Sequence, residues 1–243
     1  MALHFHDPSA AEAAVGDAIE LGGSEAHHAA AVRRVRAGEG VTVTDGRGAW
    51  ITGTCESVER DRVVVRITAR EDVPAPRPRL VLVQALAKGD RDELAVQAAT
   101  ELGVDGVVPW QAARSVSRWE GAKAEKGRAR WAAIVREAAK QAHRAWIAEV
   151  APVEAIAALA QRAAQARMLV LDPTADTALT EVSFTDARDV VLVVGPEGGI
   201  APEELDRLAQ AGAERVRLGA TILRTSTAGP AALAVVNAGL GRW

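Results

Sequence analysis

Hydrophobic and polar residues alternate in the N-terminal part of the chain, and this alternation predicts half-buried β-strands. Three runs of this kind are predicted strands: 41–44, 49–58 and 62–68. The turn sequence Asp45-Gly46-Arg47-Gly48 between the first two runs is typical of a β-hairpin. Ser24 is a candidate N-cap for a short helix that ends near Arg36. Short antiparallel strands with one helix predict a small β-barrel domain over residues 1–72.

The pattern changes after Leu80, where short apolar runs without alternation are separated by segments of helical periodicity. Such runs are typical of strands that are buried on both faces of a sheet. The runs predicted as strands are 80–86, 104–110, 168–171, 190–194 and 216–218. The segments predicted as helices are 90–103, 155–166, 202–212 and 227–240. Alternating strands and helices predict an α/β domain with a parallel sheet over residues 80–243.

A Pro-rich segment separates the two patterns. Residues 71–79 contain prolines at positions 74, 76 and 78, which cannot donate to a central strand and which favour an extended backbone. We therefore expect a stiff linker over residues 73–79 between two domains.

Charged residues are distributed unevenly along the chain. The net charge of the 243 residues is −3, but the segment 112–146 carries nine Arg and Lys against three Glu. Local basic density is the feature that matters for binding nucleic acid. Arg136, Lys140 and Arg144 repeat every four residues, which places them on one face of a predicted helix that also contains Trp131. This spacing matches a row of phosphate contacts, and a solvated helix surface is the alternative.

Several classes of protein are not indicated by the sequence. No apolar run approaches the roughly 18 residues of a membrane span, and residues 1–10 lack the regions of a signal peptide. We therefore expect a cytoplasmic protein without a membrane partner. Cys55 is the only cysteine, which excludes an internal disulfide and a Cys-clustered metal site. The close His pairs lack the i,i+4 spacing of helical ligands, so no metal is expected.

Two loops form the candidate ligand site. The run 190–194 ends abruptly in Gly195-Pro196-Glu197-Gly198-Gly199, and Pro202 opens the next helix. The second loop begins at Leu218 and Gly219. Both loops are expected to leave the carboxyl ends of neighbouring strands, where open α/β sheets bind ligands. The first loop lacks the residues of a P-loop and the dinucleotide Gly spacing, which favours a ligand held by backbone and apolar contacts. A tight turn without a ligand is the alternative.

The two loops together resemble a known family. Leu218-Gly219 followed by Ile222-Leu223-Arg224-Thr225 is similar to the closing signature of the SPOUT methyltransferases. With residues 195–199 in the same order and spacing, it resembles the RsmE family, which methylates N3 of a uridine in 16S ribosomal RNA. Further similar stretches are Gln97 with 100–104, Gln141 with Arg144, and His28 to Arg36 followed by Asp45-Gly46. The resemblance covers nearly the whole chain, although Ala98 stands where the family usually has Lys.

The resemblance implies a fold and partners. The fold is a SPOUT α/β-knot, with a parallel sheet and a C-terminal trefoil knot, preceded by a small PUA-like β-barrel domain that binds RNA. The implied cofactor is S-adenosylmethionine, and the implied partners are 16S rRNA in the small ribosomal subunit and a second copy of the chain in a homodimer. The methylated atom is then N3 of U1498. The implied cofactor-binding residues are Leu171, Gly195, Pro196, Glu197, Gly198, Gly199, Leu218, Gly219, Ile222 and Leu223.

Basic residues in both domains are expected to contact RNA. In the N-terminal helix, Arg33, Arg34 and Arg36 favour phosphate contacts, with a solvated face as the alternative. The full set of expected RNA-binding residues is Arg33, Arg34, Arg36, Arg114, Arg136, Lys140 and Arg144.

Arg224 is the candidate catalytic residue. The N3 atom of uracil lies on the Watson–Crick edge, so the base must be unpaired or flipped out, and N3 must lose its proton. An always-charged guanidinium is a poor base but stabilises the uracil anion, whereas a structural Arg that satisfies backbone carbonyls is the alternative. Ser226 stands where the family commonly has Glu. If that Glu is the base in relatives, this protein uses water, phosphate or another residue.

Other functions fit the sequence less well. A SPOUT enzyme that methylates the ribose 2′-O is disfavoured by the PUA-like N-terminus and by residues 100–104. A serine hydrolase is disfavoured because Gly-x-Ser-x-Gly is missing. A third alternative, an RNA-binding assembly factor with weak or lost catalysis, stays open because Ser226 replaces the Glu that is common in the family.

Overall fold

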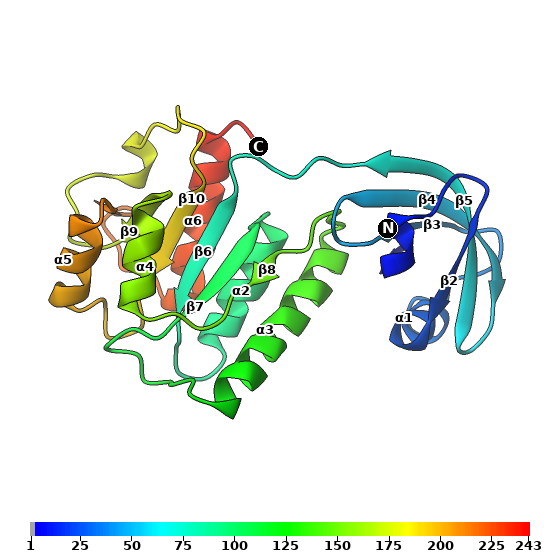
Figure 1. Cartoon of the computed structure of the whole chain (residues 1–243), viewed down its shortest axis with the longest axis horizontal. Helices are drawn as coiled ribbons and strands as arrows, with labels where there is room; N and C mark the ends of the chain where they lie inside the picture. Colours follow the sequence, from blue (N-terminus) through cyan, green and yellow to red (C-terminus); the bar gives the residue numbers. More distant parts are fainter. Residues whose placement is uncertain (1–2) are drawn as a thin grey trace. The chain divides into compact units, whose positions relative to one another are not determined.

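A computed structural model describes residues 3–243, and the chain divides into two compact units. The first unit consists of Met1–Ala75 with Ala139–Ile147, and the second of Pro76–Ala138 with Ala148–Trp243. The division at residue 75 lies inside the Pro-rich segment. The grouping of Ala139–Ile147 with the first unit was not expected, because the sequence pattern places those residues in the C-terminal domain. Each unit is described by itself below (Figure 1).

The first unit is built on a five-stranded sheet with the order β1-β3-β4-β5-β2. The strands are β1 (Leu3–His6), β2 (Ala18–Gly22), β3 (Gly40–Thr44), β4 (Ala49–Val58) and β5 (Arg62–Asp72). All pairings are antiparallel except that of β1 with β3. The alternating hydrophobic positions face one core, which contains Val43, Ile51 and Val65. The three predicted strands are therefore confirmed, and β4 has the bounds that the alternation predicted.

The helix of the first unit begins earlier than expected. Gly22 is the N-cap of α1 (Gly23–His27), so the predicted cap at Ser24 is wrong, and the chain continues as a π-helix over His28–Val32. Arg34 has a positive φ of 55°, which ends the helical path before Arg36. A short 3₁₀ helix spans Pro8–Ala11.

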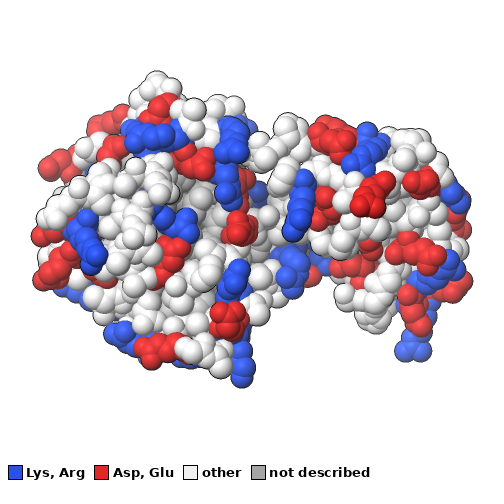
Figure 2. Space-filling model, viewed as in Figure 1, with Lys and Arg blue, Asp and Glu red and all other residues white. Residues whose placement is uncertain are grey.

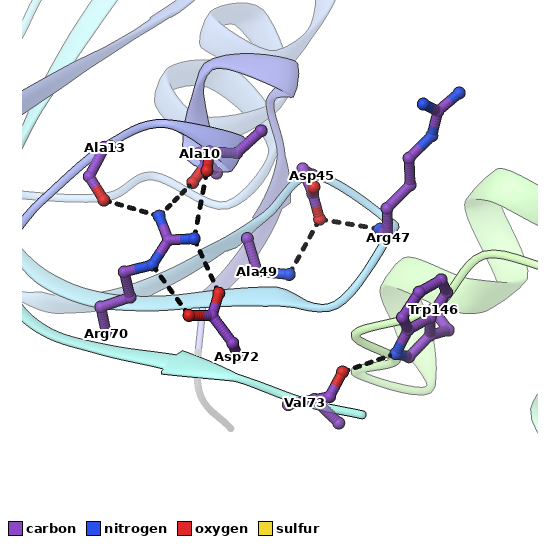
Figure 3. Close-up of polar contacts among 10 residues, drawn as sticks. Ala10, Ala13, Asp45, Arg47, Ala49, Arg70, Asp72, Val73 and Trp146 are labelled. Carbon is purple, nitrogen blue, oxygen red and sulfur yellow. Dashed lines mark hydrogen bonds and ion pairs between the residues drawn. The ribbon is translucent and has the colours of Figure 1, made fainter. Parts of the chain in front are cut away.

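Polar contacts fix the turn between β3 and β4 and the end of β5 (Figure 3). Asp45 Oδ1 accepts hydrogen bonds from the backbone N–H of Arg47 (2.7 Å) and of Ala49 (3.0 Å), which closes the turn between β3 and β4. Arg70 pairs with Asp72 at 2.7 Å and donates to the backbone carbonyls of Ala10 and Ala11 in the 3₁₀ helix and of Ala13 just after it. Trp146 Nε1 donates to the carbonyl of Val73 at 2.9 Å, which attaches the 139–147 segment to the end of β5.

The second unit contains a six-stranded sheet with the order β11-β9-β10-β6-β7-β8, and every pairing is parallel. The strands are β6 (Leu80–Ala85), β7 (Gly106–Trp110), β8 (Glu149–Val150), β9 (Arg167–Leu171), β10 (Val190–Val194) and β11 (Glu214–Val216). All residues of β6, β7 and β10 are buried, as the continuous apolar runs predicted. The predicted parallel α/β fold is confirmed. The strand β8 had no signal in the sequence pattern.

Helices cover both faces of this sheet (Figure 1). They are α2 (Arg91–Glu101), α3 (Ala122–Gln141), α4 (Ile156–Ala163), α5 (Pro202–Gln210) and α6 (Thr225–Gly239), with a 3₁₀ turn at Leu179–Glu181. Leu159 of α4 and Leu208 of α5 share a buried cluster with Val193 and the other residues on that face of the strands. On the opposite face of the sheet, α6 packs so closely against β6 that a Cβ at Gly229 would lie 3.0 Å from Leu82 Cδ1. In residues 3–243, every helix is too short or too polar to cross a bilayer.

Three details of the second unit differ from expectation. The strands β10 and β11 are not neighbours, because β9 lies between them. The helix predicted over 227–240 begins two residues earlier, since α6 starts at Thr225, and Pro230 lies inside it. The helix predicted over 90–103 is shorter, because α2 begins after Asp90, whose side chain makes no cap hydrogen bond, and ends at Glu101.

Candidate active site

A cavity of about 580 Å³ lies at the carboxyl edge of the parallel sheet. Three strand-to-helix connections form its walls, namely those after β9, β10 and β11, and residues of α2, α5 and α6 complete them. The lining residues are Arg91, Leu171, Asp172, Pro173, Thr174, Val194, Gly195, Pro196, Glu197, Gly199, Ile200, Leu205, Leu218, Gly219, Thr221, Ile222, Leu223, Arg224, Thr225 and Ala228. The expectation that both loops meet at one edge is therefore confirmed, with the end of β9 as an additional wall.

The glycines of the loop after β10 have a steric reason. A Cβ at Gly195 would lie 2.6 Å from Ile200 Cγ1, so only Gly allows the loop to fold back at the cavity wall. Gly199 has a positive φ of 73°, and its N–H donates to the carbonyl of Pro196 at 2.9 Å, which closes a tight turn. Pro202 occupies the first position of α5, as the sequence predicted.

A buried hydrogen-bond chain connects this loop to β6 and α6. Gln84 Nε2 donates to Thr225 Oγ1 at 2.8 Å, and Thr225 Oγ1 donates to the carbonyl of Gly195 at 2.9 Å. Both side chains are buried. The contact fixes the first residue of α6, and with it the end of the second loop, against the first loop. Sequence reasoning did not identify Gln84, although its position at the end of a predicted strand was a usable signal.

Glu197 connects the same loop to the connection between β6 and α2. Its Oε1 accepts hydrogen bonds from the Lys88 backbone N–H and from Arg91 Nη1, both at 3.0 Å. Partial burial opposes the charged form, but the N–H donors and the Arg91 guanidinium outweigh it and hold the pKa of Glu197 below its usual value. Glu197 is therefore a carboxylate at neutral pH, and it stabilises this loop pair.

Asp172 places a second carboxylate in the wall, after β9. Burial raises its pKa, but hydrogen bonds from Thr174 and the Arg215 guanidinium, whose Nη2 lies 2.6 Å from Asp172 Oδ2, outweigh burial. The pKa of Asp172 is therefore lower than usual. The carboxylate is 7% exposed, and Arg215 compensates its charge. Neither residue was identified from the sequence.

Arg224 lies in the cavity wall as the N-cap of α6. Its carbonyl accepts hydrogen bonds from the N–H groups of Thr227 and Ala228, and the residue is exposed. Among the residues described by the structure, none forms a hydrogen bond or ion pair with its guanidinium, so the alternative of a structural Arg that satisfies carbonyls is not supported. Ser226 is half-buried in the first turn of α6 and is not part of the cavity wall.

Nine of the ten expected cofactor residues line the cavity, and Gly198 does not. Its carbonyl accepts a hydrogen bond from Arg114 Nη1 at 3.1 Å, and a Cβ at Gly198 would lie 3.3 Å from Arg114 Cβ. Gly198 therefore faces Arg114 and not the cavity. Cofactor binding by the nine other residues stays a prediction.

The basic residues expected to bind RNA lie in different surroundings. Arg34, Arg36 and Arg136 are exposed, and Arg33 is half-buried. Lys140 is only 9% exposed, and its Nζ pairs with Glu25 Oε1 at 2.8 Å.

The expected row of Arg136, Lys140 and Arg144 on one exposed helical face is therefore wrong. The helix α3 ends at Gln141, and His143 has a positive φ of 52°, so Arg144 leaves the helical repeat. On the face shown in Figure 2, basic and acidic side chains are interspersed.

Comparisons with known proteins agree with this architecture. A family model described as an RNA methyltransferase domain matches residues 74–237, and one described as an RNA methyltransferase PUA domain matches residues 21–68. The ribosomal RNA small subunit methyltransferase E of Mycobacterium tuberculosis is 45% identical over 233 residues, which cover 94% of this chain and 89% of that protein. The protein of the same name from Bacillus subtilis is 31% identical over 228 residues, with 90% and 89% covered.

A solved structure is similar over the same length. The crystal structure of ribosomal RNA small subunit methyltransferase E from Neisseria gonorrhoeae bound to S-adenosyl methionine matches with a TM-score of 0.88 and 29% identity, and the match covers 98% of both chains. With a PUA-like N-terminal domain before an RNA methyltransferase domain, this chain belongs to the family of the ribosomal RNA small subunit methyltransferases E, the RsmE family.

Proposed function

We propose that this protein transfers a methyl group from S-adenosylmethionine to N3 of U1498 in 16S rRNA of the small ribosomal subunit. The observation that carries the proposal is the cavity at the carboxyl edge of the sheet, whose walls include the two loops that match the RsmE signature. Membership in the family supports the reaction class, and the cavity supports the position of the chemistry.

The cavity walls fit S-adenosylmethionine. The volume of about 580 Å³ is in the range of small-molecule sites. Glycine backbone and aliphatic side chains dominate the lining, including Val194, Ile200 and Leu205, which suits an adenine ring held by apolar contact and backbone hydrogen bonds. Asp172 and Glu197 add carboxylates beside a cofactor that carries a sulfonium cation. We infer that the nine lining residues expected from the sequence hold the cofactor there.

The chain's own residues have two tasks in the reaction. When bound, the cofactor supplies an electrophilic methyl group on its sulfonium. Uracil N3 must lose its proton before it accepts that group, and the resulting anion carries charge on O2, N3 and O4. The Arg224 guanidinium, exposed in the cavity wall, is placed to stabilise this anion electrostatically. The hydrogen-bond chain from Gln84 through Thr225 to Gly195 holds that wall in place.

The assembly and location belong to the same proposal. The resemblance supports a trefoil knot formed by the loops around the cavity, a homodimer, and a cytoplasmic site of action where small subunits are found. Light scattering of the purified protein tests the dimer, since a single-chain mass would contradict it.

Labelled methyl transfer into small subunits from a strain that lacks the gene tests the function. Mass spectrometry of digested nucleosides distinguishes 3-methyluridine from 2′-O-methyluridine. We expect 3-methyluridine at one position and none with a Gly195→Val control. The ribose product would indicate another SPOUT specificity, and binding without any product would indicate an assembly factor. Parallel reactions with naked 16S rRNA establish which form is the substrate.

A further inference from the structure

Arg91, which sequence reasoning did not identify, lies in the cavity wall together with Arg224. It is the first residue of α2, directly after the loop that leaves β6 at the carboxyl edge of the sheet. Its side chain is 47% exposed, whereas wall residues such as Val194 are buried. This difference places the guanidinium at the opening of the cavity and not on its floor.

The carboxylate of Glu197 holds this guanidinium in place. One oxygen, Oε1, accepts from both Arg91 Nη1 and the Lys88 backbone N–H, each at 3.0 Å. The side chain of Glu197 is 25% exposed, so the pair is partly screened from water. The position of the guanidinium is therefore set by two adjacent connections, those after β6 and after β10.

The Arg91 guanidinium keeps most of its donors. It carries five N–H groups in a planar fork, and in residues 3–243 its hydrogen-bond partner is Glu197, through Nη1. A group that donates but cannot accept, is always charged and is planar suits the paired oxygens of a phosphate. An acceptor nucleotide that flips its base into the cavity leaves its phosphate at the opening, where Arg91 lies.

We propose that Arg91 binds a phosphate of the acceptor nucleotide and that Glu197 orients it for this contact. This inference rests on the proposed function. It assigns Arg91 a role distinct from that of Arg224, since Arg91 contacts the RNA backbone and fixes the nucleotide, whereas Arg224 contacts the base on which charge develops.

The test measures kcat/KM for methyl transfer against salt concentration in four variants. Arg91→Ala removes the charge, Arg91→Lys keeps the charge without the planar fork, and Glu197→Gln keeps the guanidinium without its carboxylate partner. Arg188→Ala is the matched control, because Arg188 forms a similarly exposed pair with Asp186 at 2.7 Å just before β10, at the opposite edge of the sheet.

We expect Arg91→Ala to lower kcat/KM by about tenfold to a hundredfold, as for loss of one charged hydrogen bond, mainly through KM for the RNA. The slope of log(kcat/KM) against log[salt] should become shallower by about 0.7, the value for one phosphate of single-stranded RNA. Arg91→Lys and Glu197→Gln should keep the wild-type slope, and Arg188→Ala should change neither quantity. Calorimetry should show the same S-adenosylmethionine affinity for wild type and Arg91→Ala.

Three results would overturn the inference. A wild-type slope in Arg91→Ala together with weaker cofactor binding in that variant would make the Arg91–Glu197 pair only a clamp between two loops. A fall in kcat that high pH rescues, without a change in slope, would place Arg91 on the uracil. If wild-type protein does not methylate small subunits at all, the proposed function fails and this inference fails with it, whereas the first two results leave the function intact.

Discussion

His4 of β1 is expected to make the stability of the first unit depend on pH. Its ring is buried, with 7% exposure, and it stacks on Trp50 at 4.8 Å and on His143 at 5.1 Å. Its Nδ1 lies 2.7 Å from Thr42 Oγ1. Burial, followed by the nearby charges of His143, His6 and Lys140, lowers the pKa of His4 to about 4.

The sign and size of the effect follow from this pKa. The imidazole is neutral in the folded protein, and in the unfolded chain its pKa is near the ordinary 6.5. Its contribution to stability is therefore complete above about pH 6.5 and is lost as the pH falls toward 4. The gap between the two pKa values corresponds to about 3 kcal/mol. His4→Gln retains a polar side chain for Thr42 but does not titrate, so the variant should lack this part of the pH dependence.

Urea unfolding between pH 7 and pH 4.5, followed by hydrogen exchange of peptides from β1 and β3, measures the effect in the first unit alone. Carboxylates also titrate in this range, so the informative quantity is the stability difference between wild type and His4→Gln. That difference should shrink by about 2 to 3 kcal/mol on acidification. His27→Gln, at an exposed position of α1, is the control and should show no such trend. A constant difference across the range would refute a buried neutral imidazole at His4.

Further predictions concern the cavity and the RNA contacts. Arg224→Lys and Arg224→Ala should lower the single-turnover methylation rate in that order, by about 10²- to 10³-fold for Ala, with partial rescue at high pH because more uracil is then deprotonated. A loss that does not depend on pH would make Arg224 structural. Gly195→Val should abolish S-adenosylmethionine binding in calorimetry, since its Cβ would lie 2.6 Å from Ile200 Cγ1; unchanged affinity would place the cofactor elsewhere. Replacing Arg33, Arg34 and Arg36 together by Ala should make the slope of log K for RNA binding against log[salt] shallower by about 0.7 to 0.9 for each phosphate contact that is lost. An unchanged slope would show that these side chains only face solvent.

Much of the fold followed from local patterns in the sequence. The run 190–194 has the bounds of β10, and 49–58 those of β4, because burial of a short strand depends on its own side chains. The strand order did not follow, since the position of β9 between β10 and β11 is set by contacts among distant segments. The sequence therefore predicted the parallel sheet but placed two separated strands side by side.

Long-range contacts also explain what was missed in the basic segment and at the site. The pairing of Lys140 with Glu25 joins residues 115 positions apart and has no local signature. The glycine-rich loop after β10 could be predicted from the sequence because few other residues tolerate its backbone geometry. Arg91 was missed because it lies at the start of a segment that was interpreted only as a helix, 90–103. Its position just after a buried strand nevertheless placed it at the ligand-binding edge of the sheet.

The dispersal of the cavity wall along the chain has a consequence for biosynthesis. The loop after β11 and the start of α6 complete the wall, and along the chain they follow the loops after β6, β9 and β10. A nascent chain that ends before Leu218 contains the loops after β6, β9 and β10 but lacks the lining residues from Leu218 to Ala228. We therefore expect chains truncated before Leu218 to be inactive without acting as competitors for S-adenosylmethionine.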